Sequence, residues 1–223
     1  MFLSYLFMLI FNYIRNSKYQ YKKFKVFILT TLTMIFGIAG TVILYNIENP
    51  SSHFAFGTSL FGAIIFLPFF MLLTKLLYWK GKYLDTLHFI APSILVVVAI
   101  MRINCTLAGC CHGIISDFGI TYGNITRFPV QPMEAFLDLM AFALLFFNEK
   151  KEIVKVNNYV LLIIVYPIIR LFCEFFRDER KVFLNLSTGQ IFSIILFILG
   201  MILLVITYLN KKKKKEIDLE KKA

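Results

Sequence analysis

The sequence predicts an all-α integral membrane protein with about seven transmembrane helices and a small extracytoplasmic loop region. Of its 223 residues, 59% are hydrophobic, and the mean hydropathy is +0.74. A soluble domain is only about half apolar. Twenty-five Phe and eleven Tyr against thirteen acidic residues leave too little polar surface to cover a soluble globule. We therefore expect residues 1–223 to form one polytopic membrane domain.

The net charge of +11 raises the question of a nucleic-acid partner. A basic protein that binds nucleic acid carries its Lys and Arg clustered on one face. Here most of them lie in short segments between apolar runs, where positive charge orients helices in a membrane. We therefore expect a membrane environment and no nucleic-acid partner.

Seven apolar runs are the predicted spans, and a basic cytoplasmic tail follows at 210–223. The first run is shorter than the roughly 20 residues that a full span needs. Gly37 and Gly40 in the second run permit close helix contact. The fourth run leads directly into Arg102. The predicted spans are residues 2–14, 26–45, 54–74, 87–101, 133–147, 159–176 and 191–209.

Seven spans place the two termini on opposite sides of the membrane. With the tail in the cytoplasm, eighteen of the 24 Lys and Arg residues lie on the inside, which is a strong positive-inside bias. The N-terminus is then outside. The other six basic residues lie at or near the outer ends of the helices: Arg102, Arg127, Arg170, Arg177, Arg180 and Lys181.

A charged stripe ends the sixth apolar run. Arg170, Glu174 and Arg177 are spaced i, i+4 and i+7, so they share one face of a helix. A charged side chain within a bilayer costs roughly 2.5–3.5 kcal/mol on insertion scales. One reading is a structural ion pair that fixes helix packing. The other is a guanidinium site for an anionic ligand, in which Glu174 holds Arg170 in position.

Three further polar stretches lie on the same outer side of the predicted topology. They are residues 101–113, rich in Cys and Gly, residues 127–135, and residues 186–193. The last of these is typical of a cap that enters the final helix. Polar groups at the mouth of a helix bundle indicate a site open to the outer leaflet.

These residues resemble the prolipoprotein diacylglyceryl transferase family in four segments that follow the family order. Ser4-Tyr5 is also similar to the tyrosine-bearing start of that family's first helix. The resemblance extends from residue 4 to residue 200. The four segments are Arg102 through Gly113, Arg127-x-Pro129-x-Gln131-x-x-Glu134, Arg170-x-x-x-Glu174-Phe175-Phe176-Arg177, and Gly189-Gln190-x-x-Ser193.

The chain also departs from the family pattern. Cys105 stands where the family signature has Asn, and Cys110 where it has Glu. Phe128 occupies a usual His position. The His of a family His-Gly-Gly segment is absent from the third run, although His53 lies nearby.

The resemblance implies a bacterial plasma-membrane enzyme. Such enzymes transfer diacylglyceryl from phosphatidylglycerol to the lipobox cysteine thiol of a prolipoprotein signal peptide, and glycerol phosphate is released. No cofactor or metal is expected. The alternatives are a divergent member with another acceptor, and a non-catalytic phospholipid-binding membrane protein.

That reaction needs a cationic site for the leaving phosphate and a group that deprotonates the thiol, whose pKa is about 8.5. The Arg guanidinium supplies a fixed charge and a fork that matches phosphate oxygens. Our catalytic assignments are a clamp of Arg102 and Arg170 with Glu174 behind it, Tyr5 for the head group, and His112 as a candidate proton acceptor. Our assignments for substrate binding are Arg102, Arg127, Gln131, Glu134, Arg177 and Gly113.

Three of the four cysteines are close together in the sequence, at Cys105, Cys110 and Cys111. The Cys-x4-Cys-Cys-His spacing matches neither paired zinc motifs nor haem attachment. Outside the cytoplasm a disulfide forms readily, so we expect Cys105 to pair with Cys110 or Cys111. Free packed thiols, a metal site and a covalent acyl carrier are the alternatives. Cys173 in the sixth run is expected to be packed.

Overall fold

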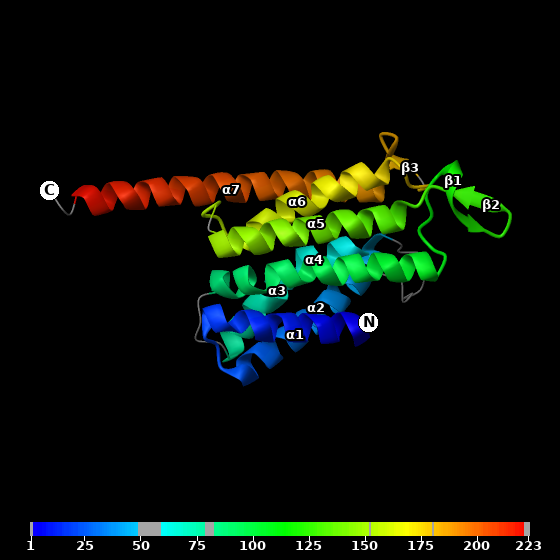
Figure 1. The fold of residues 1–223 in the computed structure, drawn as a ribbon. Helices are drawn as coiled ribbons and strands as arrows, with labels where there is room; N and C mark the ends of the chain where they lie inside the picture. The colour runs from blue at the N-terminus through cyan, green and yellow to red at the C-terminus, as the bar shows by residue number, and fades with distance from the viewer. Residues whose placement is uncertain (1, 49–58, 79–82, 152, 180, 221–223) are drawn as a thin grey trace.

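The computed structural model describes residues 2–48, 59–78, 83–151, 153–179 and 181–220. Within these residues the chain is mostly helical, and successive helices lie side by side in opposite directions (Figure 1). The C-terminus is at one end of the bundle, and two short hairpins are at the other. The helices are α1 (Phe2–Tyr19), α2 (Lys23–Glu48), α3 (Leu60–Tyr78), α4 (Tyr83–Leu107), α5 (Val130–Lys151), α6 (Asn158–Glu174) and α7 (Thr188–Glu220).

Four helices in the described part of the chain are long and apolar enough to cross a membrane. They are α2, α4, α5 and the segment Thr188–Lys213 of α7. A shorter apolar stretch, Leu60–Leu72, lies in α3. Several apolar helices of this kind confirm the predicted class, an all-α integral membrane protein.

The helices extend beyond most of the predicted spans. Helix α1 continues to Tyr19, so Arg15 lies in the helix, beyond the end of the predicted span 2–14. Helix α4 reaches Leu107 and therefore carries Cys105. The basic tail continues α7 as helix to Glu220, because Lys, Glu and Leu are good helix formers. The first residues of the predicted third span, 54–58, lie outside the described residues.

The two polar loops contain short antiparallel hairpins, which no sequence pattern predicted. In the first, β1 (Ile115–Tyr122) pairs with β2 (Ile125–Arg127). In the second, β3 (Lys181–Phe183) pairs with β4 (Leu186–Ser187), and Leu184 and Asn185 between them both have positive φ. Two central residues of positive φ match the twist of a two-residue hairpin.

Close packing of α2 against α3 depends on two glycines. A Cβ atom added to Gly40 would collide with the carbonyl group of Gly62, and a Cβ at Gly62 would collide with the Gly40 carbonyl. Small residues allow two helix backbones to approach in this way. The predicted close contact at Gly40 is confirmed, whereas a Cβ at Gly37 would be in ordinary contact, 3.9 Å from Ala63.

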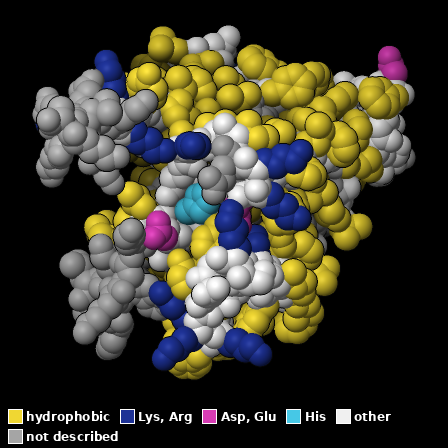
Figure 2. Space-filling model, turned by 60° about the vertical axis from the view of Figure 1, so that its left-hand side comes forward, with side chains coloured by type: hydrophobic (Ala, Val, Ile, Leu, Met, Phe, Trp, Pro, Cys, Tyr) yellow, Lys and Arg dark blue, Asp and Glu magenta, His cyan; other side chains and the backbone are white. Residues whose placement is uncertain are grey.

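A buried ion pair joins α1 to α5 at the end opposite the hairpins. Arg15 Nε donates to Glu149 Oε1 at 2.9 Å, and Arg15 also donates to the carbonyl oxygen of Phe89. The Arg15 guanidinium lies 4.8 Å from the Phe89 ring centroid and 5.6 Å from that of Tyr19. Figure 2 shows this end of the bundle, where Lys and Arg side chains gather between hydrophobic flanks.

Candidate active site

Three helices bring separate charged segments of the sequence together near the hairpin end. Glu134 in the first turns of α5 is only 1% exposed. Its carboxylate lies 2.9 Å from Arg102 Nε of α4, 3.0 Å from an Arg170 terminal nitrogen of α6, and 3.9 Å from one of Arg177. We call Arg102, Glu134, Arg170, Glu174 and Arg177 the arginine cluster.

Glu174 supports the same cluster from the end of α6. Its carboxylate lies 3.0 Å from Arg170 and accepts a 2.7 Å hydrogen bond from Ser187 Oγ. Gly189 allows this approach, because a Cβ at that position would lie 2.7 Å from Glu174 Oε1. The sequence predicted that Glu174 positions Arg170, and the two side chains are in contact.

Ser187 also caps α7. Its hydroxyl accepts from Gln190 N at 3.2 Å, while Gln190 Oε1 accepts from Ser187 N at 2.9 Å. This reciprocal pair is a capping box, so the predicted helix cap is confirmed. The cap and the cluster share Ser187, which ties the start of the last helix to the charged site.

A cavity of about 600 Å³ opens beside the arginine cluster. All three arginines of the cluster line it, as does Glu174. Among the described residues, Arg102 forms one ion pair, 2.9 Å from its Nε to Glu134, whereas the terminal nitrogens of Arg170 contact both Glu134 and Glu174. Other lining residues are Tyr45, Glu48, Ser59, Leu60, Phe61, Cys111, Tyr166, Glu179, Lys181, Val182, Thr188 and Gly189.

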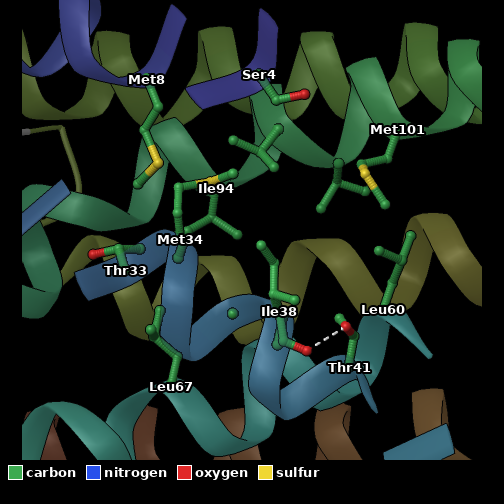
Figure 3. A pocket seen from close by; sticks show the side chains of 14 residues that line it. Ser4, Met8, Thr33, Met34, Ile38, Thr41, Leu60, Leu67, Ile94 and Met101 are labelled. Carbon is green, nitrogen blue, oxygen red and sulfur yellow. Dashed lines mark hydrogen bonds between the residues drawn. The ribbon is translucent and has the colours of Figure 1, made fainter. Parts of the chain in front are cut away.

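The described residues also enclose an apolar pocket of about 70 Å³, whose lining is shown in Figure 3. Its walls come from α1 to α4, and methionine and aliphatic side chains line it. Leu60 lines both spaces, and Met101 of the pocket directly precedes Arg102 of the cavity. The polar and apolar spaces therefore share part of their walls.

Several predicted substrate-binding residues pack around the loops and do not line the cavity. Arg127 donates to the Gly113 carbonyl at 3.0 Å and to Asp178 at 2.7 Å. Gln131 donates to the Cys110 carbonyl at 2.7 Å. A Cβ at Gly113 would overlap the backbone of Phe128. These contacts hold the first hairpin against the end of α6.

Tyr5 and His112 also lie apart from the described cavity lining. The Tyr5 hydroxyl is 2.9 Å from Thr31 Oγ1 of α2. The His112 ring packs on Tyr122 with centroids 4.5 Å apart. Among the described residues, neither side chain forms a hydrogen bond or ion pair with the arginine cluster, so the direct catalytic roles of these two residues stay predictions.

The four cysteines are free thiols, so the expected disulfide is absent from the described structure. Cys105, Cys110 and Cys111 nevertheless lie together, with their sulfur atoms within 4.8 Å of one another. Hydrogen bonding from Cys105 lowers the pKa of the Cys111 thiol to about 4, against the effect of burial and with help from Arg177 and Arg102. Cys173 is buried in α6, as predicted.

Sequence reasoning missed several polar residues of the site. Glu48 and Lys181 line the cavity from segments that carried no motif. Tyr166 is fully buried beside it. Asp138 lies one turn after Glu134 on α5 and is fully buried, and neither of its oxygens has a hydrogen-bond partner in the described structure. The i, i+4 spacing of Glu134 and Asp138 within an apolar run was the available signal.

Comparisons with known proteins agree with the motif resemblance. A family model described as prolipoprotein diacylglyceryl transferase matches residues 2–206. A Clostridium perfringens protein named phosphatidylglycerol–prolipoprotein diacylglyceryl transferase 2 is 32% identical over 90% of this chain and 86% of its own. Proteins with the name phosphatidylglycerol–prolipoprotein diacylglyceryl transferase from Clostridium tetani and Francisella tularensis subsp. mediasiatica are both 29% identical, over 89% and 80% of this chain and 87% and 73% of their own. The chain belongs to the prolipoprotein diacylglyceryl transferase family.

Proposed function

We propose that this protein transfers diacylglyceryl from phosphatidylglycerol to the lipobox cysteine thiol of a prolipoprotein signal peptide and releases glycerol phosphate. The family and the names of the relatives support this activity. In the structure, the observation that carries it is a cavity lined by three arginines, of which Arg102 forms one ion pair among the described residues.

The phosphate of the lipid binds at Arg102 in this proposal. A guanidinium has five N–H donors, and in Arg102 only Nε faces the Glu134 carboxylate. Its terminal N–H groups remain for the phosphate oxygens, with Arg170 and Arg177 adding positive charge. As the C–O bond breaks, negative charge grows on the leaving phosphate, and a fixed cation in a water-poor site stabilises it.

The diacylglyceryl part of the lipid occupies the apolar side of the same site. Leu60, which lines both the cavity and the apolar pocket, supports this placement. A pocket of about 70 Å³ holds only part of an acyl chain. The remainder lies along the apolar flanks of the bundle in the bilayer.

We also propose that all seven helices cross the bacterial plasma membrane as one domain, with the N-terminus outside and the C-terminus in the cytoplasm. The opposite positions of the two hairpins and the C-terminus support this orientation. The basic face in Figure 2 would then be cytoplasmic, as the positive-inside bias requires. The arginine cluster would lie toward the outer leaflet.

The acceptor thiol has to lose a proton before it attacks. Glu48 lines the cavity and forms no ion pair within the described residues, whereas Glu174 is held by arginine. The Glu48 carboxylate accepts a hydrogen bond from Ser59 Oγ at 3.1 Å. It is therefore better placed than His112 to receive the thiol proton, and we assign it that role.

The test is glycerol phosphate release by purified protein in lipid nanodiscs that contain phosphatidylglycerol and a lipobox peptide. Arg102→Lys keeps the charge and loses the fork, so we expect release to fall about 100-fold, the usual effect of removing one such donor. Arg15→Lys is the matched control, because it makes the same change at the opposite end of the bundle. Full activity of Arg102→Lys would overturn the phosphate assignment, and no release by the unaltered protein would overturn the activity.

A further inference from the structure

The end of α4 places two thiols against each other. Gly109 has a φ of +61°, its N–H donates to the Thr106 carbonyl, and Cys110 N–H donates to the Cys105 carbonyl at 3.1 Å. This is the bonding pattern of a Schellman motif, in which the side chains at the positions of Cys105 and Cys110 meet. The contact of these two cysteines thus follows from how the helix ends.

The next residue brings a third thiol to the same point. Cys111 has a φ of +58°, in the left-handed region that few residues other than glycine adopt. Backbone strain of this kind persists where the surrounding structure enforces it, and it clusters at functional sites. The turn directs Cys111 into the lining of the cavity that contains Arg102 and Arg177.

We propose that Cys105, Cys110 and Cys111 form a three-thiolate site for a soft divalent cation of the zinc class, with its fourth position open to the cavity. Zinc binds thiolates at about 2.3 Å, so sulfurs around one tetrahedral ion are roughly 3.8 Å apart. The three sulfurs already lie within 4.8 Å of one another. Small side-chain rotations would therefore complete the coordination.

The charges around the three cysteines favour such a complex. Three thiolates and one divalent ion have a net charge of −1, which Arg102 and Arg177 beside Cys111 would stabilise. The thiols would release their protons when the metal binds.

The open position suits the acceptor thiol, and this step rests on the proposed function. A thiol that coordinates zinc is deprotonated outright. The lipobox thiol would replace water on the metal and give its proton to Glu48. Its sulfur would then form a bond to the glycerol carbon as the C–O bond to phosphate breaks, and glycerol phosphate would leave. Only substitution occurs, so no oxidant or reductant is needed.

Cadmium binding tests the site without reference to catalysis. Reduced, metal-free protein in nanodiscs is titrated with Cd²⁺, and the ultraviolet charge-transfer absorption of cadmium thiolate is followed. We expect one Cd²⁺ per chain. Cys111→Asn suits the left-handed backbone and removes the ligand, so affinity should fall at least about 100-fold, since even outer-shell changes cost 10–100-fold. Cys173→Ser should bind as the unaltered chain does.

Equal binding by Cys111→Asn with an unchanged melting temperature would overturn the site. So would a Cys105–Cys110 disulfide in protein isolated without reductant, detected by mass spectrometry. For the thiol-activating step, we expect chelation to lower glycerol phosphate release at least tenfold and Zn²⁺ to restore it. Release that persists fully after chelation overturns that step and leaves the transferase function standing. No release with or without Zn²⁺ overturns the function itself.

Discussion

Replacing Glu134 with Gln tests whether this carboxylate holds the arginine cluster together. Gln keeps the size of the side chain and removes its charge. Three buried guanidinium groups, of Arg102, Arg170 and Arg177, then face a neutral amide. The perturbation is almost purely electrostatic, because Glu134 is 1% exposed and the substitution leaves no void.

The distances set the size of the effect. Unit charges 2.9–3.9 Å apart attract by about 4–6 kcal/mol per pair at an effective dielectric constant near 20. Desolvation offsets most of this attraction, and breaking one buried ion pair costs about 3–5 kcal/mol in practice. For a chain of this length, a loss of that size lowers the melting temperature by roughly 6–20 °C.

Thermal unfolding of the detergent-solubilised protein, followed by size exclusion of a fluorescent fusion, measures the shift. Glu179→Gln is the control, since Glu179 also contacts Arg177 at 2.9 Å but is 40% exposed. Exposed pairs contribute about 0–1 kcal/mol, so that variant should melt within a few degrees of the unaltered chain. Equal melting of both variants would refute the view that Glu134 neutralises the buried guanidinium groups.

Three further outcomes are expected. Gly189→Ala should lower lipid transfer about 10–100-fold without unfolding the protein. The added Cβ would lie 2.7 Å from Glu174 Oε1 and would displace the carboxylate that holds Arg170. A fully active variant would contradict this prediction. Arg15→Met should lower stability by about 3–5 kcal/mol, since it leaves the Glu149 charge buried and unpaired, while transfer per folded molecule stays unchanged. Cys111 stays a thiolate until the pH falls to about 4, so mass spectrometry should find it alkylated by iodoacetamide as fast at pH 6 as at pH 8, whereas an ordinary thiol slows roughly 100-fold.

The helical class could be predicted from the sequence because apolar runs of near-membrane length have few other uses. The residues at which the helices end could not be predicted from the sequence. Whether Arg15 ends a helix or continues it depends on Glu149, more than a hundred residues away. The hairpin strands have two to eight residues and no alternation strong enough to separate them from loop.

For the candidate site, the i, i+4 spacing predicts that Arg170 and Glu174 share one helix face, and the two are paired. The prediction that Arg177 continues this face is wrong, because α6 ends at Glu174 and Arg177 forms a β-bridge with Gly113. The positive-inside topology predicts that Arg102 lies at the same membrane level. The central position of Glu134 was not predictable, because it depends on how α4, α5 and α6 pack. The position of His112 also depends on tertiary packing. Its ionisable ring suggested a catalytic role, and in the structure the ring packs against Tyr122.

The two buried charge clusters of this bundle differ in a way that separates structure from function. Arg15 is matched by one carboxylate, donates to the Phe89 carbonyl and is surrounded by aromatic rings. The arginine cluster joins three cations to two buried glutamates, Arg177 also pairs with the 40% exposed Glu179, and the cluster lines a cavity of about 600 Å³. A balanced pair without an opening stabilises a fold and binds nothing. Guanidinium groups that line an opening are available to bind an anion, and the phosphate of phosphatidylglycerol is the anion that the proposed transfer requires.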